Sequence, residues 1–259
     1  MEKVIVVKIG GVALGTGDTT IEDIVSLQRQ GKRLIIVHGG GKQVNEWLDR
    51  RGVEARFVRG ERVTDGVTLE VVTAVLGGLV NKEITAEINC RGGRAVGISG
   101  VDGGTVRCRI RSEEMGYVGD VVEIDTALPE ALLEAGYLPV ISPVSLNFFD
   151  KTPTAPAVLN VNGDPLAGEI AAAIKAAELI FLTDVDGVCD GAGELIGHLS
   201  PVEAEALVAS GVVRGGMIPK IRACLKALPV VPVTRIIDGR QRHALLNEVT
   251  GGKSGTTIN

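Results

Sequence analysis

Two glycine-rich segments of this chain each follow an apolar stretch, and the residues around them could bind a phosphate. The first stretch, residues 4–9, contains Lys8 and is followed by Gly10 and Gly11. A lysine is costly to bury unless its ammonium group reaches an anion or an open cleft. The second stretch ends at the glycine triplet 39–41, where backbone N–H groups at the start of a helix favour phosphate or a developing oxyanion. Each could be an ordinary tight turn, but two at neighbouring strand ends predict an anion site.

Neither segment matches the commoner nucleotide-binding fingerprints. The triplet 39–41 lacks the later glycine of G-x-G-x-x-G, which disfavours a dinucleotide-binding fold. Residues 252–254 (GKS) are similar to the end of a P-loop, but Asn247 stands where the earlier glycine is required. We therefore interpret residues 252–254 as a surface loop.

Polar residues also follow later apolar stretches. Residues 159–164 (LNVNGD) bring two amides and a carboxylate to the start of a helix, and taken alone Asp164 is best explained as a helix cap. Residues 182–188 (LTDVDGV) end a buried strand with two carboxylates and a glycine. Lys220 lies in the first turn of a helix, where the helix dipole disfavours a cation. A nearby anion would explain Lys220, although a neutral role on the surface is an alternative.

These residues depend on the elements that position them, and apolar stretches alternate with helix-period stretches along most of the chain. Strands are expected at residues 4–9, 34–37, 95–98, 138–141, 179–183 and 233–237. Helices are expected at residues 20–30 (capped by Thr19 or Thr20), 43–51, 68–90, 128–135, 166–177, 201–210 and 217–227. Hairpins are expected within residues 105–124 and 145–160. The alternation predicts an α/β protein with a mostly parallel sheet, helices on both faces, and ligands beyond the carboxyl ends of the strands.

The composition limits the class of protein. The chain has 259 residues, 45% of them hydrophobic and 3% aromatic, which suits one large domain with an aliphatic core. A net charge of −5 without a basic run gives no reason to expect nucleic acid. We expect a cytoplasmic protein with no membrane partner, because no signal peptide or membrane-spanning run is evident. The four cysteines and three histidines lack metal-ligand spacing, so we expect reduced thiols and no protein-bound metal.

Nine segments in this order resemble the amino-acid kinase family: VKIGG (7–11), VHGGG (37–41), RGERVTD (59–65), LVNKE (79–83), LEAGYLPVIS (133–142), LNVNGD (159–164), LTDVDGV (182–188), GGMIPK (215–220) and the GT pair at 255–256. Each is weak alone, but the set is specific and covers almost the whole chain. The resemblance is greatest to members that phosphorylate N-acetyl-L-glutamate in arginine biosynthesis. It implies an open, eight-stranded αβα sandwich, in which about 1–164 bind the acceptor and form a dimer and about 165–259 bind ATP.

The resemblance also implies catalytic roles. Lys8 and Lys220 would neutralise charge on the phosphoryl group as it moves, since phosphoryl transfer depends on alignment and electrostatic stabilisation. Asp164 would hold both lysines in place by ion pairing. The N–H groups of Gly11 and Gly40 would bind the transferred phosphoryl oxygens.

Two binding sites are implied in the same way. Gly40 and Gly41 would line the acceptor site, where Arg62 and Asn160 would hold the α-carboxylate, Arg62 with a bidentate grip. The nucleotide pocket would be lined by Asp184, Val185, Asp186, Gly187, Val188, Val212, Val213 and Arg214. Mg²⁺ would sit mainly on ATP phosphates and water, without a direct protein ligand. The acceptor carboxylate is already ionised at neutral pH, so no general base is required.

Some positions depart from the family pattern or leave alternatives open. Glu61 stands where these kinases usually have an apolar residue, and it could pair with Arg62 or Arg59 or change the pocket for the tail of the acceptor. A related kinase of lysine biosynthesis acts on aminoadipate, often attached to an acidic carrier protein, and would need a basic rim around the site. Such a rim could come from Arg56, Arg59, Arg107, Arg109 and Arg111, although dispersed surface arginines are the plainer explanation. The RVTD and GGMIPK segments favour N-acetylglutamate.

A catalytically silent, ligand-sensing relative is a further alternative. The complete set of lysines and Asp164 argues against it.

The oligomeric state is also an expectation from the resemblance. Hexameric, arginine-inhibited relatives carry an extra N-terminal helix, whereas this sequence begins almost directly with its first strand. We therefore expect a homodimer, insensitive to arginine, joined through the helix at 68–90 and its neighbouring strand. A regulatory or carrier protein as an additional partner stays an open alternative.

Overall fold

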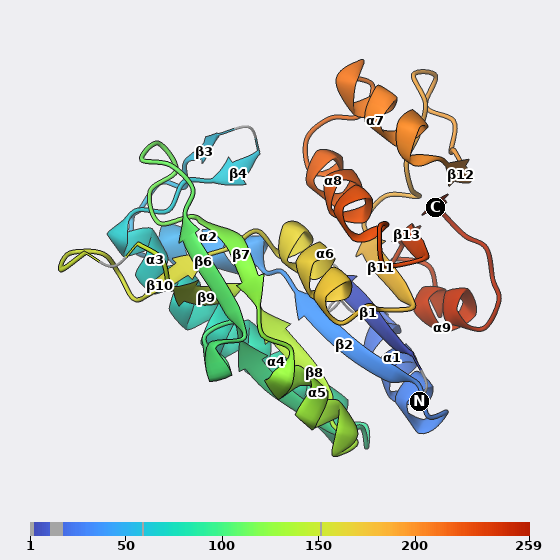
Figure 1. Ribbon diagram of the computed structural model, residues 1–259, viewed down its shortest axis with the longest axis horizontal. Helices are drawn as coiled ribbons and strands as arrows, with labels where there is room; N and C mark the ends of the chain where they lie inside the picture. Colours follow the sequence, from blue (N-terminus) through green and yellow to red (C-terminus); the bar gives the residue numbers. More distant parts are fainter. Residues whose placement is uncertain (1–2, 11–17, 59, 151) are drawn as a thin grey trace.

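The computed structural model describes residues 3–10, 18–58, 60–150 and 152–259, and its centre is an eight-stranded sheet (Figure 1). In spatial order the strands are β12 (His198–Leu199), β14 (Thr256–Ile258), β13 (Val233–Asp238), β11 (Glu178–Thr183), β1 (Val4–Ile9), β2 (Arg33–His38), β8 (Leu138–Ser142) and β5 (Ala95–Ser99). Neighbouring strands are parallel except β13 and β14. The expected α/β class with an open, mostly parallel eight-stranded sheet is confirmed.

Helices cover both faces of this sheet. One face packs against α5 (Ala127–Glu134), α6 (Gly163–Ala173), α7 (Pro201–Ala209) and α8 (Met217–Ala227). The other packs against α1 (Thr20–Arg29), α2 (Gly41–Arg50), α3 (Gly66–Val72), the π-helix η1 (Thr73–Val80), α4 (Asn81–Cys90) and α9 (Ala244–Val249). Each face has its own buried, mainly aliphatic cluster. The arrangement is the three-layer αβα sandwich that the sequence predicts.

The alternation of side chains along strand β1 determines which helix layer Lys8 faces. Val4 and Val6 belong to the buried cluster on the α6 face, whereas Ile5 and Val7 belong to the cluster on the opposite face. Side chains of a strand alternate between its two faces. Lys8 continues the series of Val4 and Val6, so it points toward α6.

Smaller sheets lie beside the central one, on the side of β5 and β8 (Figure 1). A four-stranded sheet has the order β10 (Val158–Asn160), β9 (Val144–Asn147), β6 (Val106–Ile110) and β7 (Gly119–Ile124), and a two-stranded ribbon pairs β3 (Phe57–Val58) with β4 (Glu61–Arg62). Pairs β6–β7 and β9–β10 are antiparallel, as the two expected hairpins require. A short 3₁₀ helix, η2 (Asp102–Gly104), precedes β6.

The long helix expected at 68–90 is present as three consecutive segments, α3, η1 and α4, of which the middle one is wound as a π-helix. Such wide turns often occur at functional sites. Here the π-helix packs closely against the glycine turn after β2. A Cβ atom added at Gly40 would lie 2.6 Å from Leu76 Cδ2 and 3.3 Å from Val80 Cγ2.

Some boundaries differ from the sequence prediction. Helix α1 is not capped by a threonine side chain, since Asp18 Oδ1 accepts the hydrogen bond from the Thr20 N–H at 2.6 Å. Helix α6 begins at Gly163, earlier than expected, and Asn162 caps it. Residues 252–254 lie in a loop, as expected, but the sequence analysis missed α9, β12 and β14 around it. No helix in the described ranges is long and apolar enough to cross a membrane.

Candidate active site

A carboxylate shared by two lysines lies at the centre of the candidate site. Asp164 Oδ1 is 2.7 Å from Lys8 Nζ, and its Oδ2 is 2.9 Å from Lys220 Nζ. Lys8 is only 7% exposed and Asp164 only 5%. Burial by itself raises the pKa of the Asp164 carboxyl group, but the charges of both lysines outweigh it and lower that pKa below its ordinary value. The carboxylate therefore stays ionised and holds two cations from opposite halves of the chain.

Three elements bring these groups together. Lys8 points to the α6 face of the sheet, where the Asn162 side chain caps α6 by accepting a hydrogen bond from the Asp164 N–H at 3.1 Å. Because Asn162 is the cap, the Asp164 side chain is available to the lysines, which corrects its interpretation as a simple cap. Lys220 lies in the first turn of α8, and Asp164 is the anion that explains a cation there.

The glycine turn between β2 and α2 forms the next part of the site. Gly40 has a φ of 145°, a conformation that favours glycine, and Leu76 leaves no space for a side chain there. Gly39, Gly40 and Gly41 all line a cavity together with Lys8. The turn leads directly into α2, so its N–H groups lie at the positive end of a helix dipole. Gly11, the other predicted oxyanion donor, lies outside the described residues.

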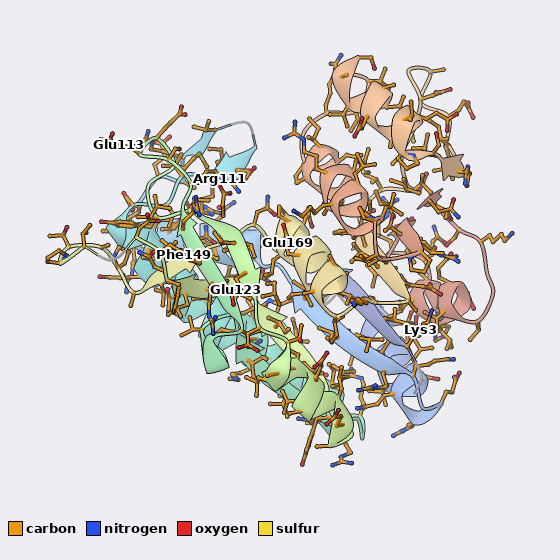
Figure 2. All side chains as sticks on the ribbon, in the orientation of Figure 1. Lys3, Arg111, Glu113, Glu123, Phe149 and Glu169 are labelled. Carbon is orange, nitrogen blue, oxygen red and sulfur yellow. The ribbon has the colours of Figure 1, made fainter. Side chains whose placement is uncertain are left out.

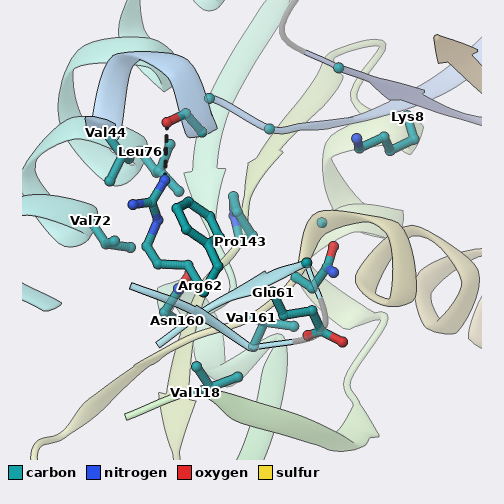
Figure 3. Close-up of a pocket in the computed structure, with 18 residues that line it drawn as sticks. Lys8, Val44, Glu61, Arg62, Val72, Leu76, Val118, Pro143, Asn160 and Val161 are labelled. Carbon is teal, nitrogen blue, oxygen red and sulfur yellow. Dashed lines mark hydrogen bonds between the residues drawn. The ribbon is translucent and has the colours of Figure 1, made fainter. Parts of the chain in front are cut away.

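This cavity has a volume of about 260 Å³ and carries a cation at either end (Figure 3). Lys8 reaches it on one side and Arg62 on the other. Between them its wall is largely apolar, with Val44, Val72, Leu76, Val118, Pro143 and Val161 among the lining residues. A cavity of this kind fits a small molecule with two separated anionic groups and an apolar middle.

Arg62 is held rigidly at its end of the cavity. Its Nη2 donates to the Gly41 carbonyl oxygen at 3.1 Å and to Asn45 Oδ1 at 2.6 Å, and its guanidinium lies over the Phe57 ring at 4.9 Å. The buried Nη1 has no hydrogen-bond partner among the described residues. Burial lowers the pKa of Arg62, but an arginine stays charged at neutral pH. The N–H groups of Arg62 Nη1, at the cavity wall, can therefore donate hydrogen bonds to a carboxylate ligand.

Asn160 lies beside Arg62 in the cavity wall. Its Nδ2 donates to Thr64 Oγ1 at 2.9 Å, and its backbone N–H donates to the Tyr117 carbonyl oxygen at 3.0 Å. These contacts fix the side chain and use one amide hydrogen, so the second is available to a ligand.

Glu61 does not pair with Arg62, which corrects one of the two expected pairings; Arg59 is outside the described residues. Neighbours on strand β4 point in opposite directions, and Figure 3 shows the Glu61 carboxylate turned away from the Arg62 guanidinium. Glu61 instead pairs with Arg111 at 2.5 Å, and Arg111 also contacts Asp120 at 2.6 Å (Figure 2 labels Arg111 at the end of β6). Glu61 therefore leaves the charge of Arg62 free for a ligand.

The residues predicted to bind the nucleotide lie in two loops, of which the first follows β11. Residues 184–186 are exposed, whereas Gly187 and Val188 are buried. The Val188 N–H donates to Thr256 Oγ1 at 2.8 Å, and a Cβ at Gly187 would lie 2.8 Å from the same oxygen. Strand β14, which the sequence analysis did not predict, therefore anchors this loop.

The second loop joins α7 to α8. Val213 is buried, whereas Val212 and Arg214 are exposed, and Arg214 Nε donates to the Gly211 carbonyl oxygen at 2.8 Å. A Cβ at Gly191 would lie 3.9 Å from Val212 Cγ2, so this loop lies against the segment that follows β11.

Arg240 is a residue of this region that sequence reasoning missed. It follows β13, and its guanidinium contacts Asp238 at 2.8 Å and Asp186 at 3.1 Å. The side-chain hydrogen bond from Arg240 is the main reason that the pKa of Asp238 is lowered to about 2. Arg240 thus links the ends of two neighbouring strands, but Asp186 is 54 positions away and no local pattern indicates the contact.

No group of three histidine, cysteine, aspartate or glutamate residues that could hold a metal occurs in the described ranges. Both oxygens of Asp164 face lysines, so this carboxylate does not suit a divalent cation.

A comparison with protein families matches residues 3–234 to the amino acid kinase family. The chain belongs to this family.

Individual proteins similar to this chain give a narrower comparison than the family. Acetylglutamate kinase of Dehalococcoides mccartyi (strain CBDB1) is 49% identical over 255 residues, which cover 98% of this chain and 94% of that protein. Acetylglutamate kinase of Cereibacter sphaeroides (strain ATCC 17029) is 44% identical, with 98% and 87% covered. Among solved structures, smu.665 from Streptococcus mutans UA159 has a TM-score of 0.83 at 28% identity, covering 100% of this chain and 99% of that one. Carbamate kinase from Giardia lamblia bound to AMP-PNP, with a TM-score of 0.71 at 16% identity and 99% and 98% covered, shares the fold.

Proposed function

We propose that this chain is an ATP-dependent kinase that transfers the γ-phosphoryl group to the side-chain carboxylate of N-acetyl-L-glutamate. The product is N-acetylglutamyl 5-phosphate, an acyl phosphate of arginine biosynthesis. The observation that carries the proposal is the match to acetylglutamate kinases at 44–49% identity over nearly the whole chain. The cavity between Lys8 and Arg62 supports it, because N-acetylglutamate is a small dicarboxylate with an apolar middle.

In this proposal the acceptor lies across the cavity. Arg62 and Asn160 hold its α-carboxylate with the buried Nη1 and the remaining amide hydrogen. The side-chain carboxylate then faces Lys8 and the glycine turn formed by Gly40 and Gly41. The apolar wall contacts the methylene groups and the acetyl group.

Phosphoryl transfer occurs at the other end of the cavity. Lys8 and Lys220 approach the moving phosphoryl group from the two halves of the chain, and Asp164 holds them at a fixed separation. Backbone N–H groups of Gly11 and Gly40 bind the phosphoryl oxygens. The protein supplies alignment and positive charge, while the nucleophile is the carboxylate of the acceptor itself.

ATP binds to the half that begins near residue 165, and the acceptor binds to the half before it. Residues 184–188 and 212–214 line the nucleotide site, with the buried members contributing backbone groups. Mg²⁺ is held by ATP phosphates and water, which agrees with the occupied oxygens of Asp164.

The two alternative functions are less well supported. A carrier-linked acceptor needs a free basic rim, but Arg107 pairs with Glu123 and Asp125, and Arg111 pairs with Glu61 and Asp120. A silent, ligand-sensing protein would not need the assembled pair of lysines.

We further propose a cytoplasmic homodimer that arginine does not inhibit. Exposed apolar side chains on α3 and η1, Val67 (46% exposed) and Leu79 (38%), and the edge position of β5 support contacts along the long helix. Light scattering that gave a hexamer, or strong inhibition by arginine, would contradict this.

The function is tested by ADP release with MgATP and each of four acceptors: N-acetylglutamate, glutamate, N-acetylaminoadipate and carbamate. Acyl phosphate is trapped as its hydroxamate. We expect strong turnover with N-acetylglutamate only. Absence of ADP release with all four acceptors would contradict the proposal and would favour a carrier-linked acceptor.

A further inference from the structure

His38 is a buried side chain beside the glycine turn that the proposed mechanism does not use. It is the last residue of β2 and only 1% exposed. Its Nδ1 lies 2.7 Å from the Gly39 carbonyl oxygen, and its Nε2 lies 3.2 Å from Asn81 Nδ2. A carbonyl oxygen can only accept a hydrogen bond, so Nδ1 must carry the proton.

Asn81 determines the state of the other ring nitrogen. Its Nδ2 lies 2.9 Å from the Val140 carbonyl oxygen and 3.1 Å from that of Ile98. Its Oδ1 accepts a hydrogen bond from Lys82 Nζ at 3.1 Å. These partners fix the orientation of the amide. Its two N–H hydrogens face three acceptors, so one of them is shared between a carbonyl oxygen and His38 Nε2. His38 Nε2 is therefore the acceptor, and the ring is the neutral tautomer with its proton on Nδ1.

The surroundings of His38 agree with a neutral ring. Burial is the main reason that its pKa is lowered to about 4, and the charges of Lys8 and Lys82 act in the same direction. The hydrogen bond to Gly39 opposes them without reversing the shift.

The hydrogen bond from His38 also orients the next peptide group. The Gly39–Gly40 peptide is trans, so the Gly40 N–H points opposite to the Gly39 carbonyl. That carbonyl is held toward His38, whose partner Asn81 belongs to the helix layer opposite α6. The Gly40 N–H therefore faces the α6 side, where Lys8 lies; a Cβ at Gly39 would be 3.8 Å from Lys8 Nζ. Within the described ranges no acceptor of the Gly40 N–H is present.

We propose that His38, oriented by Asn81, is a positioning residue that aims the Gly40 N–H at the phosphoryl group during transfer. The inference rests on the proposed function, because it concerns the same phosphoryl site. Three consecutive glycines have more backbone freedom than any other tripeptide, so their N–H groups need an external anchor. A donor stabilises a transition state best when it is already oriented before the reaction.

Two substitutions separate the roles of the two ring nitrogens. An asparagine amide reaches the position of Nδ1 and keeps a donor to Gly39, whereas a glutamine amide reaches the position of Nε2 and keeps only the contact to Asn81. We expect His38→Gln to lower kcat by at least about tenfold, with both KM values within about threefold of the original. We expect His38→Asn to restore kcat to within about threefold of the original enzyme.

A matched control lies at the far end of α4. Asn89 also forms hydrogen bonds with the backbone of β5. Its Nδ2 donates to the Ala95 carbonyl oxygen at 3.1 Å, and its Oδ1 accepts from the Ala95 N–H at 2.7 Å. Asn89→Leu should lower the melting temperature while leaving kcat unchanged. Calorimetric titration with MgADP gives the fraction of each variant that is folded, so that a loss of kcat is not a loss of active protein. Unchanged kcat in His38→Gln, or equal losses in both His38 variants, would overturn the proposal.

A spectroscopic measurement tests the geometry without turnover. The chain has three histidines, so ¹⁵N NMR of the imidazole rings can assign His38 by comparison with His38→Gln. We expect a neutral ring protonated on Nδ1 at pH 7, and protonation on Nε2 would overturn the positioning role. Failure of the proposed function would be seen separately, as absence of turnover by the unmodified enzyme with N-acetylglutamate.

Discussion

The cavity proposed for the acceptor and the loops proposed for the nucleotide are held in place by different means. The cavity is lined partly by polar side chains that are half-buried and hydrogen-bonded, as Arg62 is to Asn45. The nucleotide loops expose residues 184–186, and their buried members, Val188 and Val213, belong to the aliphatic core on the α6 face. In the proposed reaction, we therefore expect one region to present charged side chains to its ligand and the other to present mainly backbone.

This difference follows from the size of the two ligands in the proposed reaction. A small dicarboxylate offers few atoms, so specificity requires polar side chains that are already in position. A nucleotide is larger, and loops can bind it through many main-chain groups. Substitutions should accordingly have large effects at the shared centre, intermediate effects in the cavity and small effects in the nucleotide loops.

The largest effect is expected at the centre, where the two regions meet. Lys8→Ala or Lys220→Ala should lower kcat by at least about a hundredfold, because each removes a donor to the moving phosphoryl group. Steady-state assays of ADP release measure this. Lys226→Ala is a matched control on α8, since Lys226 is exposed and pairs with Glu169 at 3.5 Å. Near-normal turnover of either central variant would disprove the assigned mechanism.

The next effect tests the cavity alone. Arg62→Ala should raise the KM for N-acetylglutamate by roughly tenfold or more and change kcat little, because the ion pair exists in the ground state and the transition state alike. Arg50→Ala is a matched control, and it should leave this KM unchanged since Arg50 is exposed, lies over the Trp47 ring and does not line the cavity. A loss confined to kcat in Arg62→Ala would remove Arg62 from the acceptor site.

A pH effect on stability should come from His38, which is buried beside the glycine turn. The pKa of His38 is about 4 in the folded chain, against an ordinary value of 6.5. Between these values the unfolded chain binds a proton that the folded chain does not, so stability falls as pH is lowered through this window. The slope is at most about 1.4 kcal/mol per pH unit. Urea denaturation at pH 7 and pH 5 should give a smaller difference for His38→Gln, and an equal difference would contradict this origin.

The smallest effect is expected in the nucleotide loops. Asp186→Ala breaks an exposed ion pair with Arg240, and exposed ion pairs contribute little because solvent screens them. The KM for MgATP should change by less than about threefold. A tenfold rise would mean that this loop, too, recognises its ligand through a side chain.

The sequence predicted six strands of the central sheet and singled out the two lysines, one in strand β1 and one in helix α8, because these features depend on local patterns. A lysine in an apolar strand and a lysine at a helix start are each unusual, and one buried carboxylate explains both. The face to which Lys8 points was not predicted, and it follows from the two buried clusters of the structure.

Other features could not be predicted because they depend on contacts between distant segments. The link from His38 to Asn81 spans 43 positions, and the link from Val188 to Thr256 spans 68. The π-helical winding of η1 was not predicted either, although its sequence TAVLGGLV places two consecutive glycines within a helix. Strand β14 has only three residues, too few for an alternating pattern to be evident.

The shared carboxylate of Asp164 has a consequence for proton balance. Two ammonium groups and one carboxylate leave a single positive charge that does not change during the proposed reaction. ATP and an ionised carboxylate become ADP and an acyl phosphate with the same total negative charge, and no proton is released. Kinases that phosphorylate a hydroxyl group must remove a proton, whereas this centre can complete each cycle without proton exchange with solvent.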